Sequence, residues 1–418
     1  MTKLLFLILG ELSTGELTIA DSFQAGLPKT RYESYFIVPE HQNGYVKSLN
    51  IPYLSLGLND GKLINRKKVD LLIKEIKPDF LIFCDVFTVE YSEKWSGINL
   101  EIIKEYNIPV ISLDEYEYIK AGYSIDYYGS VTKKLKPLLE ECDYIIKNCP
   151  LTMPVGQRKR YFRLFNHINP LDDKRKSVIK DKIVENKDDK LIFITTSYWE
   201  TLNIYKIPAL SMFIKWNNRI IFNYLKMLDQ NITIIHVGHG KWSDLDSDKI
   251  NYKYFETLDP VDFESYLLAA DLYITNNIVS ITLTKAILGK VPSIVFQNDK
   301  IIDFSKFKKR LSEMPMWYQE MAEDLKIAYP FKASVFGWSN FLKTVLKGNP
   351  YVDTFVISSL FKLSESIDNL KRLLNDNKSI EELKNNQEKF IELYNNVPSA
   401  FNVIEEIVNE EVGDLKWI

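Results

Sequence analysis

The segment from Tyr266 to Phe296, YLLAADLYITNNIVSITLTKAILGKVPSIVF, constrains the fold more than any other part of the chain. Its apolar run 272–274 predicts a short strand, a polar turn follows, and Ser280 or Thr282 can cap a helix. The run 291–296 shows little alternation of apolar and polar residues, as expected of a parallel strand that is covered on both faces. The segment is therefore predicted to be a βαβ unit. In α/β proteins the turn after such a strand commonly binds an anionic or nucleotide ligand.

Strand-like and helix-like runs alternate through both halves of the chain. In the first half, strands are predicted at Leu4–Leu9, Glu33–Val38, Pro52–Leu56, Asp79–Phe83, Pro109–Leu113 and Tyr144–Lys147, and helices at Leu17–Ala25, His41–Leu49, Arg66–Ile76, Leu100–Tyr106 and Val131–Glu140. In the second half, further strands are predicted at Leu191–Thr195, Ile232–Val237 and Asn251–Phe255, and helices at Pro208–Leu228 and Pro260–Ala269. This alternation predicts an α/β fold with two Rossmann-like, doubly wound, mostly parallel sheets.

With 418 residues the chain is too long for one ordinary core, so we expect two domains. The first is predicted to span residues 1–150, and a looser stretch with scattered prolines and charges, 151–189, is predicted to be the linker. The second domain is predicted to span 190–350, with an irregular, aromatic insertion at 297–350. Residues 351–418 show helical apolar spacing and are predicted to form helices that pack back across both domains.

The composition argues against several classes of protein. A net charge of −3 gives no support to a nucleic-acid partner. No apolar segment approaches the ~20 residues that cross a bilayer, so we expect a cytoplasmic protein without a transmembrane segment. The three cysteines show no CxxC spacing and the histidines no HxxxH or HxE pattern, so no metal site is expected.

A glycine-rich turn, GELSTGE at residues 10–16, follows the first predicted strand. Its glycines would let backbone amides approach a ligand, and its hydroxyls can cap a helix. The turn matches neither the dinucleotide pattern GxGxxG nor the phosphate-binding pattern GxxxxGK[ST]. A purely structural turn and a ligand-facing role for Gly10, Ser13, Thr14 and Gly15 therefore both remain open.

The two predicted Rossmann-like halves and the motif of the opening segment resemble the GT-B glycosyltransferases, in which two such domains face a cleft. The resemblance is closest to the branch with the bacterial lipid-II-forming N-acetylglucosaminyltransferase and the antibiotic-modifying glycosyltransferases. In that branch a strand after AAD, a His-Gly-Gly turn, a Ser/Thr, a helix and a Gly-x-Pro strand line the donor pocket. The matching residues here are Ala269, Ala270, Asp271, Ser280, Thr282, Gly289 and Pro292. Asn276 and Asn277 depart from the family pattern, because they stand in place of its histidine-glycine or glycine-glycine turn.

The resemblance also implies which other residues bind the donor. Thr196 and Ser197 correspond to the turn that contacts the donor phosphates, and Phe255 with Glu256 to the segment beside the base. The full donor set is Thr196, Ser197, Gly238, His239, Phe255, Glu256, Asn276, Asn277, Ser280 and Thr282. The resemblance further implies a nucleotide-sugar co-substrate, UDP- or dTDP-linked, and no resident cofactor.

Glycosyl transfer needs a base that deprotonates the acceptor, and the first domain is expected to supply it. The candidates at strand ends and in the glycine turn are Glu11, Asp85 and Asp114, with Glu16 and His41 as further carboxylate and imidazole groups nearby. Glu16 is better explained as a first-turn acid that supports the helix dipole. For Asp85 a helix cap, and for Asp114 a solvated loop, remain alternatives of equal weight.

The sequence therefore predicts a glycosyltransferase that moves a sugar from a nucleotide-sugar donor to a small-molecule or peptide-like acceptor, without a metal and with inversion. A nucleotide-sugar epimerase of the same fold is one alternative. A non-catalytic binding or scaffold protein is another, and the two asparagines of the donor turn keep it open. The partners expected are the donor and an unknown acceptor, and a homodimer is left open.

Overall fold

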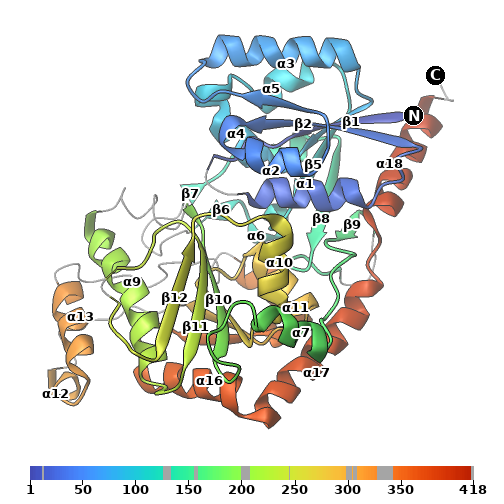
Figure 1. Ribbon diagram of the computed structural model, residues 1–418. Helices are drawn as coiled ribbons and strands as arrows, with labels where there is room; N and C mark the ends of the chain where they lie inside the picture. Colours follow the sequence, from blue (N-terminus) through green and yellow to red (C-terminus); the bar gives the residue numbers. More distant parts are fainter. Residues whose placement is uncertain are drawn as a thin grey trace.

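The computed structural model describes residues 1–11, 14–125, 133–154, 159–198, 208–243, 245–297, 304, 308–326 and 342–415. Two parallel sheets dominate it, one above the other in Figure 1. The first has the order β3-β2-β1-β4-β5-β8-β9. Its strands are β1 (Thr2–Leu7), β2 (Tyr32–Pro39), β3 (Tyr53–Leu56), β4 (Phe80–Phe83), β5 (Val110–Asp114), β8 (Tyr144–Cys149) and β9 (Tyr161–Arg163). Their helices are α1 (Gly15–Ala25), α2 (Asn43–Ser48), α3 (Lys62–Ile76), α4 (Val86–Ser96), α5 (Leu100–Lys104) and α6 (Tyr118–Ala121).

The second sheet has the order β12-β11-β10-β13-β14-β15. Its strands are β10 (Lys190–Thr196), β11 (Ile232–Gly238), β12 (Ile250–Phe255), β13 (Leu272–Thr275), β14 (Ser293–Gln297) and β15 (Val356–Ser359). The helices around it include α7 (Asp173–Lys180), α9 (Pro208–Lys226), α10 (Pro260–Ala269), α11 (Ile281–Leu288), α13 (Met316–Lys326), α15 (Lys343–Leu346) and α16 (Leu363–Asn375). The unit β13–α11–β14 is the βαβ unit predicted from the sequence, and the doubly wound α/β fold is confirmed.

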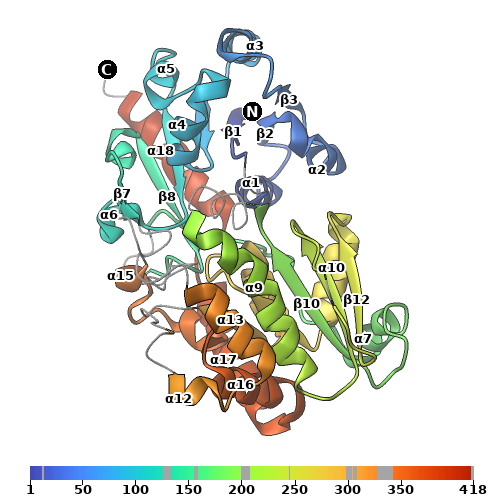
Figure 2. The ribbon, with the colours of Figure 1, turned by 90° about the vertical axis from the view of Figure 1, so that its left-hand side faces the viewer.

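Apolar strands explain the layering of helices on both faces of each sheet. All four residues of β4 are buried, and in β10 alternate residues serve two different cores. Phe193 packs into a core that continues into the first domain, whereas Ile192 and Ile194 face α9, α13 and α16. Figure 2 shows α9, α13 and α16 on one side of the second sheet and α7 and α10 on the other. One face of the second sheet therefore shares a continuous core with the first domain.

The C-terminal helices α17 (Asn377–Asn395) and α18 (Ala400–Leu415) carry the chain back to the first domain, as predicted (Figure 1). The hydroxyl of Tyr394 on α17 lies within hydrogen-bond distance of the carbonyls of Cys149 and Leu164, at 3.0 and 2.9 Å. On α18, Glu411 accepts a hydrogen bond from the Tyr144 hydroxyl at 2.6 Å. The first sheet is thus closed by the last helix of the chain.

Several sequence predictions differ from the structure. The helix expected at Val131–Glu140 is wrong over its described part, where a two-residue strand β7 (Lys133–Lys134) and a 3₁₀ turn η2 (Leu138–Glu141) follow one another instead. Pro137, which lacks a backbone N–H, opens that turn. Strand β9 lies in the range predicted as linker and pairs with β8, so the first sheet extends beyond residue 150. Strand β15 lies in the range predicted to hold only helices, and it pairs with β14.

Candidate functional site

The strand orders locate the site. In both sheets the chain starts in the middle, runs to one edge, returns and then builds the other side, so β1/β4 and β10/β13 are switch points. Loops after the two strands of a switch point separate, and ligands bind at the carboxyl ends of those strands. The predicted residues at the ends of β1, β4, β10 and β13 lie at these positions. The same edges carry Asp114, the last residue of β5, and His239, which follows β11.

At the ends of β10 and β11, the two backbones approach closely and are joined by hydrogen bonds. Gly238 has a φ of 120°, and a Cβ atom on it would lie 2.0 Å from the carbonyl oxygen of Thr196. The Thr196 hydroxyl donates to the carbonyl of His239 at 2.6 Å, and the His239 amide donates back to the Thr196 carbonyl at 3.2 Å. The His239 ring is half-buried, 4.5 Å from the ring of Tyr198. Three predicted donor residues, Thr196, Gly238 and His239, therefore form one rigid turn, and Ser197 follows it directly.

The buried ring of His236 is hydrogen-bonded to this turn. Its Nε2 lies 2.8 Å from the Thr196 hydroxyl and its Nδ1 lies 2.6 Å from the Tyr252 hydroxyl. The Thr196 hydroxyl already donates its proton to a carbonyl, so it must accept from Nε2–H, and Tyr252 must then donate to Nδ1. Burial lowers the pKa of His236 to about 3, which keeps the ring neutral, as this arrangement requires.

The turn between β13 and α11 holds its asparagines inside the protein. Asn276 and Asn277 are 3% and 4% exposed. The side-chain amide of Asn276 donates to Asn217 on α9 at 3.2 Å, and the side-chain oxygen of Asn277 accepts from the Val279 amide at 3.1 Å. Both asparagine side chains therefore stabilise the turn. The Thr275 hydroxyl also contributes, because it accepts from the Asn277 amide at 3.1 Å.

A row of hydroxyls lies beside the start of α11. Ser280 caps this helix without a side-chain bond to its amides, and the Ser280 hydroxyl lies 3.2 Å from that of Tyr273. The Tyr273 hydroxyl is in turn 2.6 Å from that of Thr195. The first amides of a helix, here those of Ile281 and Thr282, have no partner within the helix. Tyr273 could not be recognised as a site residue from the sequence, because it stands within an apolar strand. Its ring is buried, and its hydroxyl lies near the end of the strand.

The opposite side of the site comes from the first domain. Gly10 lies so close to the carboxylate of Glu16 that a Cβ atom on Gly10 would be 2.8 Å from its three end atoms. Thr14 is the N-cap residue of α1 and Gly15 is its first residue, whereas Ser13 lies outside the described residues. Glu11 forms an ion pair with Lys94 at 3.2 Å. The Glu16 carboxylate therefore lies against the backbone of the glycine turn, and the Glu11 carboxylate is paired with a lysine of α4.

Asp85 lies two residues after the end of β4, and Asp114 is the last residue of the neighbouring strand β5. Asp85 caps α4 by accepting from the Phe87 amide at 3.0 Å, and it accepts from the Thr88 hydroxyl at 2.6 Å. Asp114 is 2% exposed, and its Oδ1 accepts from the amides of Tyr116 and Tyr118 at 3.1 and 3.4 Å. Burial raises the pKa of Asp114 to about 7 and also raises the pKa of Asp85. The solvated loop considered for Asp114 is wrong, because its carboxyl group is buried.

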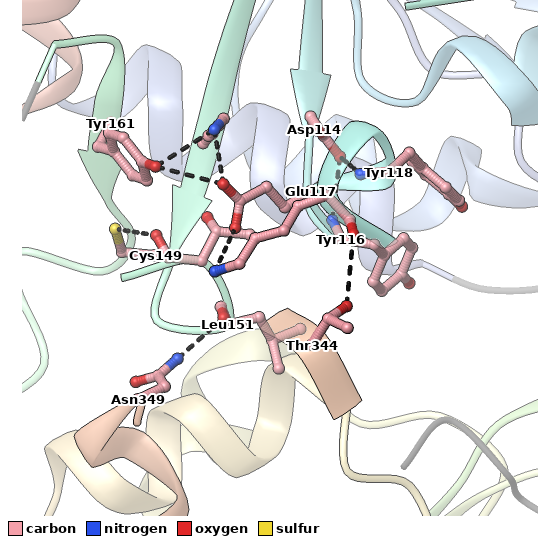
Figure 3. A network of polar contacts seen from close by, with 12 residues as sticks. Asp114, Tyr116, Glu117, Tyr118, Cys149, Leu151, Tyr161, Thr344 and Asn349 are labelled. Atoms are coloured by element: carbon pink, nitrogen blue, oxygen red, sulfur yellow. Dashed lines mark hydrogen bonds and ion pairs between the residues drawn. The ribbon is translucent and has the colours of Figure 1, made fainter. Parts of the chain in front are cut away.

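Two further polar residues, Lys147 on β8 and Tyr161 on β9, lie beside Asp114 on the neighbouring strands (Figure 3). Neither was predicted from the sequence. Lys147 is paired in register with Asp114, and Tyr161 is paired in register with Lys147. The Lys147 ammonium group donates to Glu117 at 2.7 Å and to the Tyr161 hydroxyl at 3.2 Å. Glu117 is 7% exposed and has a φ of 51°, unusual for a residue with a side chain.

The remaining predicted site residues, Phe255, Glu256 and His41, lie apart from Asp114, Lys147 and Tyr161. Phe255 is half-buried at the end of the edge strand β12, and Glu256 after it is exposed. His41 is exposed in the 3₁₀ turn after β2. Across the part of the chain that the structure describes, no group of three or more His, Cys, Asp or Glu side chains is arranged to hold a metal ion. Nor does any helix in the described ranges combine the length and apolar character needed to cross a membrane.

The two sets of strand ends lie on facing sides of the domains. Glu115, next to Asp114, interacts electrostatically with Tyr351 of the second domain, which also interacts with Tyr273. Close by, Thr344 at the start of the second domain's α15 donates to the carbonyl of Lys120 on α6 at 3.4 Å (Figure 3). Glu115 of the first domain therefore faces Tyr351 of the second, and the Tyr351 hydroxyl lies 3.4 Å from that of Thr284 on α11.

The fold is the GT-B fold, and glycosyltransferases are among the solved structures that this chain resembles. The spinosyn forosaminyltransferase SpnP has a TM-score of 0.55 at 10% identity, covering 98% of this chain and 98% of that one. The spinosyn rhamnosyltransferase SpnG has a TM-score of 0.55 at 10% identity, covering 98% of this chain and 100% of that one. The glycosyltransferase VinC in complex with dTDP has a TM-score of 0.50 at 11% identity, covering 98% and 99% of the two chains.

Within the proteins of this fold, the chain belongs to the Family of unknown function (DUF6365), whose model matches residues 23–413. A comparison with curated proteins finds no match. At such low identity the solved structures define the fold, and the activity has to be argued from the residues of the site.

Proposed function

We propose that the chain is a glycosyltransferase that moves a sugar from a nucleotide-sugar donor to a small-molecule or peptide-like acceptor. The observation that carries the proposal is the buried carboxyl group of Asp114 at the carboxyl edge of the first sheet. Its neighbour Glu115 interacts with Tyr351 of the second domain, whose hydroxyl lies 3.4 Å from that of Thr284 on α11. One side offers a proton acceptor and the other offers groups that stabilise a departing anion. Transfer of a sugar from a nucleotide diphosphate needs both.

The donor diphosphate would bind at the start of α11. Backbone amides and the positive end of the helix dipole attract phosphate oxygens there. The hydroxyls of Ser280 and Tyr273 and the amides of Ile281 and Thr282 are the groups that would donate hydrogen bonds. The rigid turn of Thr196, Gly238 and His239 would contribute the neighbouring wall. These groups can stabilise the leaving diphosphate without a metal, which supports metal independence, and UDP or dTDP is the expected carrier.

Asp114 is the base in this proposal. A base works best when its pKa lies near the working pH, and burial raises the pKa of Asp114 to about 7. Asp114 would take the proton from the acceptor hydroxyl while the acceptor oxygen attacks the anomeric carbon. The bond from that carbon to the phosphate oxygen breaks, and the diphosphate leaves with the electron pair. Attack from the face opposite the leaving group inverts the configuration.

The other two predicted bases have partners that limit such a role. Glu11 is held by Lys94, and Asp85 is occupied by an amide and a hydroxyl that cap α4. In this proposal Asp85 acts on Asp114 as a neighbouring negative charge, which helps to keep the pKa of Asp114 raised.

One observation favours a second candidate function, a non-catalytic protein that binds a nucleotide. The asparagine side chains at positions 276 and 277 point into the protein, so the turn before α11 differs chemically from a glycine turn. Such a protein would bind the nucleotide diphosphate at α11 but would not turn over a nucleotide sugar.

Nucleotide binding and turnover separate these possibilities. We expect UDP or dTDP to raise the thermal unfolding midpoint of the full chain in a concentration-dependent way, because a ligand of the folded state stabilises it. Ser280→Ala and His239→Ala should weaken this effect, whereas Ser48→Ala, a matched exposed serine on α2, should not. If no nucleoside diphosphate shifts the midpoint, both functions must be abandoned.

Turnover is tested with the same variants. Asp114→Asn should abolish sugar release from a bound nucleotide sugar without weakening nucleotide binding, and Asp85→Asn and Glu11→Gln should have smaller effects on turnover. A protein that binds a nucleotide sugar but neither transfers nor hydrolyses it with any acceptor would support the non-catalytic function instead.

A further inference from the structure

Four carboxylates gather at the carboxyl edge of the first sheet. We call Glu16, Asp85, Asp114 and Glu115 the carboxylate cluster. The Thr88 hydroxyl lies within hydrogen-bond distance of two of its members, 2.6 Å from Asp85 and 3.4 Å from Glu16. Asp85 lies two residues after the end of β4, Asp114 is the last residue of the adjacent parallel strand β5, and Glu115 follows it. Glu115 is electrostatically coupled to the other three members of the cluster.

Lys147, the cation paired in register with Asp114, lowers the pKa of Asp114 through its charge but forms no ion pair with it. Its ammonium group donates to Glu117 and to the Tyr161 hydroxyl (Figure 3). Within the described ranges, no lysine or arginine forms an ion pair with Asp85, Asp114 or Glu115. Burial and mutual repulsion raise the pKa of Glu115 well above its usual range. Keeping these carboxyl groups in their charged form is therefore unfavourable unless a cation joins them.

A second observation points to a ligand. Oδ2 of Asp114 has no hydrogen-bond partner among the described residues, although the residue is only 2% exposed. The amides of Tyr116 and Tyr118 both donate to Oδ1, and the negative charge of Asp85 acts on the same carboxyl group. Leaving a buried carboxylate oxygen without a donor destabilises the folded protein, and a donor from a bound molecule would remove that destabilisation.

Aromatic rings lie next to the carboxylate cluster. The ring of Phe87, two residues after Asp85, is 4.3 Å from that of Tyr118, which is 5.5 Å from that of Tyr116. Aromatic faces attract organic cations, as carboxylates do. The described carboxylates are not arranged as ligands of a metal ion, so an organic ammonium group fits the site better than a metal cation.

We infer that a substrate of this protein carries a protonated amino group, which binds in the carboxylate cluster beside the rings of Phe87, Tyr116 and Tyr118. The inference rests on the proposed function and adds a substrate class to it. Because the cluster belongs to the domain opposite the proposed diphosphate site, the amino group is assigned to the acceptor. The other source of the same chemistry is an amino sugar on the donor, and the experiment distinguishes the two.

The test compares amines with neutral molecules of the same shape, using the full chain. In the acceptor arm, the binding of aromatic amines such as tyramine and of neutral counterparts such as 4-ethylphenol is measured by ligand-observed NMR, with and without UDP. In the donor arm, UDP-glucosamine is compared with UDP-glucose by calorimetry. We expect at least tenfold tighter binding of the amines in the acceptor arm and no such preference in the donor arm.

Variants connect the preference to the cluster. Glu115→Gln and, separately, Glu16→Gln should reduce the preference for the amine at least fivefold, while Glu320→Gln, an exposed glutamate on α13, should leave it unchanged. The variants keep the shape of the side chain, and their far-UV circular dichroism and unfolding midpoint establish that they fold. A preference confined to the donor arm would overturn the assignment to the acceptor.

If neither arm shows a preference for the amine, or if the preference survives both cluster variants, the inference is overturned. This result is distinguishable from failure of the proposed function, because UDP binding at α11 is measured in the same samples. A chain that binds UDP but does not discriminate amines keeps the proposed function and loses the inference.

Discussion

Nε2 of His236 lies 2.8 Å from the hydroxyl of Thr196, and this bond connects the buried interior of the second sheet to the turn at its carboxyl edge. The hydrogen bonds run in one direction along a chain. The Trp242 amide donates to the Tyr252 hydroxyl, Tyr252 to His236, His236 to Thr196, and Thr196 to the carbonyl of His239. The neutral imidazole therefore fixes the direction of these hydrogen bonds and so the orientation of the Thr196 hydroxyl at the candidate site.

Replacing His236 by phenylalanine should cost about 2–4 kcal/mol at pH 7.5, because the half-buried hydroxyl groups of Thr196 and Tyr252 each lose a partner. The pKa of His236 is about 3 in the folded protein, against a usual value of 6.5. The unfolded chain therefore takes up a proton below pH 6.5 that the folded chain does not, and the wild type loses stability as the pH falls. Denaturant unfolding at pH 5.5 should show a cost smaller by about 1.4 kcal/mol. An equal cost at both pH values would contradict the neutral chain.

Gly238→Ala should destabilise the protein by more than about 3 kcal/mol, because the new Cβ would meet the Thr196 carbonyl at 2.0 Å and the φ of 120° is unfavourable for alanine. Gly44→Ala is the control, since Gly44 lies in α2 with no atom near its Cβ position. Alanine there should be neutral or stabilise by up to about 1 kcal/mol. Urea unfolding of both variants measures the difference. Equal effects would mean that the turn after β11 adapts freely.

The free energy of unfolding of Asp114→Asn, taken relative to that of the wild type at the same pH, should be larger at pH 8 than at pH 5. The folded pKa of about 7 lies above the usual value of 3.8, so the wild type is stabilised at low pH and loses that stability as the pH rises toward and through 7. The loss is on the order of 1.4 kcal/mol per pH unit in this range, and the asparagine variant lacks it. Its amide oxygen can still accept from the Tyr116 and Tyr118 amides. Parallel unfolding curves at pH 5, 6.5 and 8 measure the effect, and a difference that does not change with pH would argue against the raised pKa.

Lys147→Met should cost about 3 kcal/mol, because it leaves the carboxylate of Glu117, whose side chain is 9% exposed, without its closest cation. Glu117→Gln in the same chain should recover part of that loss, since the uncompensated charge is removed. We expect a coupling energy above about 1 kcal/mol from the double-mutant cycle. Lys120 lies 3.6 Å from the other oxygen of Glu117, so Lys120→Met is the control and should cost less. Additive effects of the two changes would show that the bond between Lys147 and Glu117 contributes little.

Much of the fold could be predicted because each strand signal is local. The run 272–296 predicts its own strand, helix and strand, and Asp85 and Asp114, predicted at strand ends, lie at one edge of the sheet. Helix α4 was missed because its sequence, VFTVEYSEKWS, lacks a clear apolar period, and its start is decided by the cap at Asp85.

The site could be predicted only in part, because its side chains are paired across long stretches of chain. The environment of Asn276 depends on Asn217, 59 residues earlier, and the two residues meet only when α9 covers the sheet. In the same way, Asn349 donates to the carbonyls of Pro150 and Leu151 at 3.0 and 2.9 Å, almost 200 residues away (Figure 3). No local pattern reports such partners.

The sequence by itself determined the α/β class, the order of strands and helices in most of the chain, and the strand ends at which polar residues stand. These follow from apolar periodicity and turn chemistry, which act over a few neighbouring residues. Only the tertiary structure decided which of those polar residues are buried, paired or left without a partner. Burial and charge pairing depend on what the rest of the chain places nearby, so the raised pKa of Asp114, the neutral ring of His236 and the inward turn of Asn276 and Asn277 could be seen only in the folded protein.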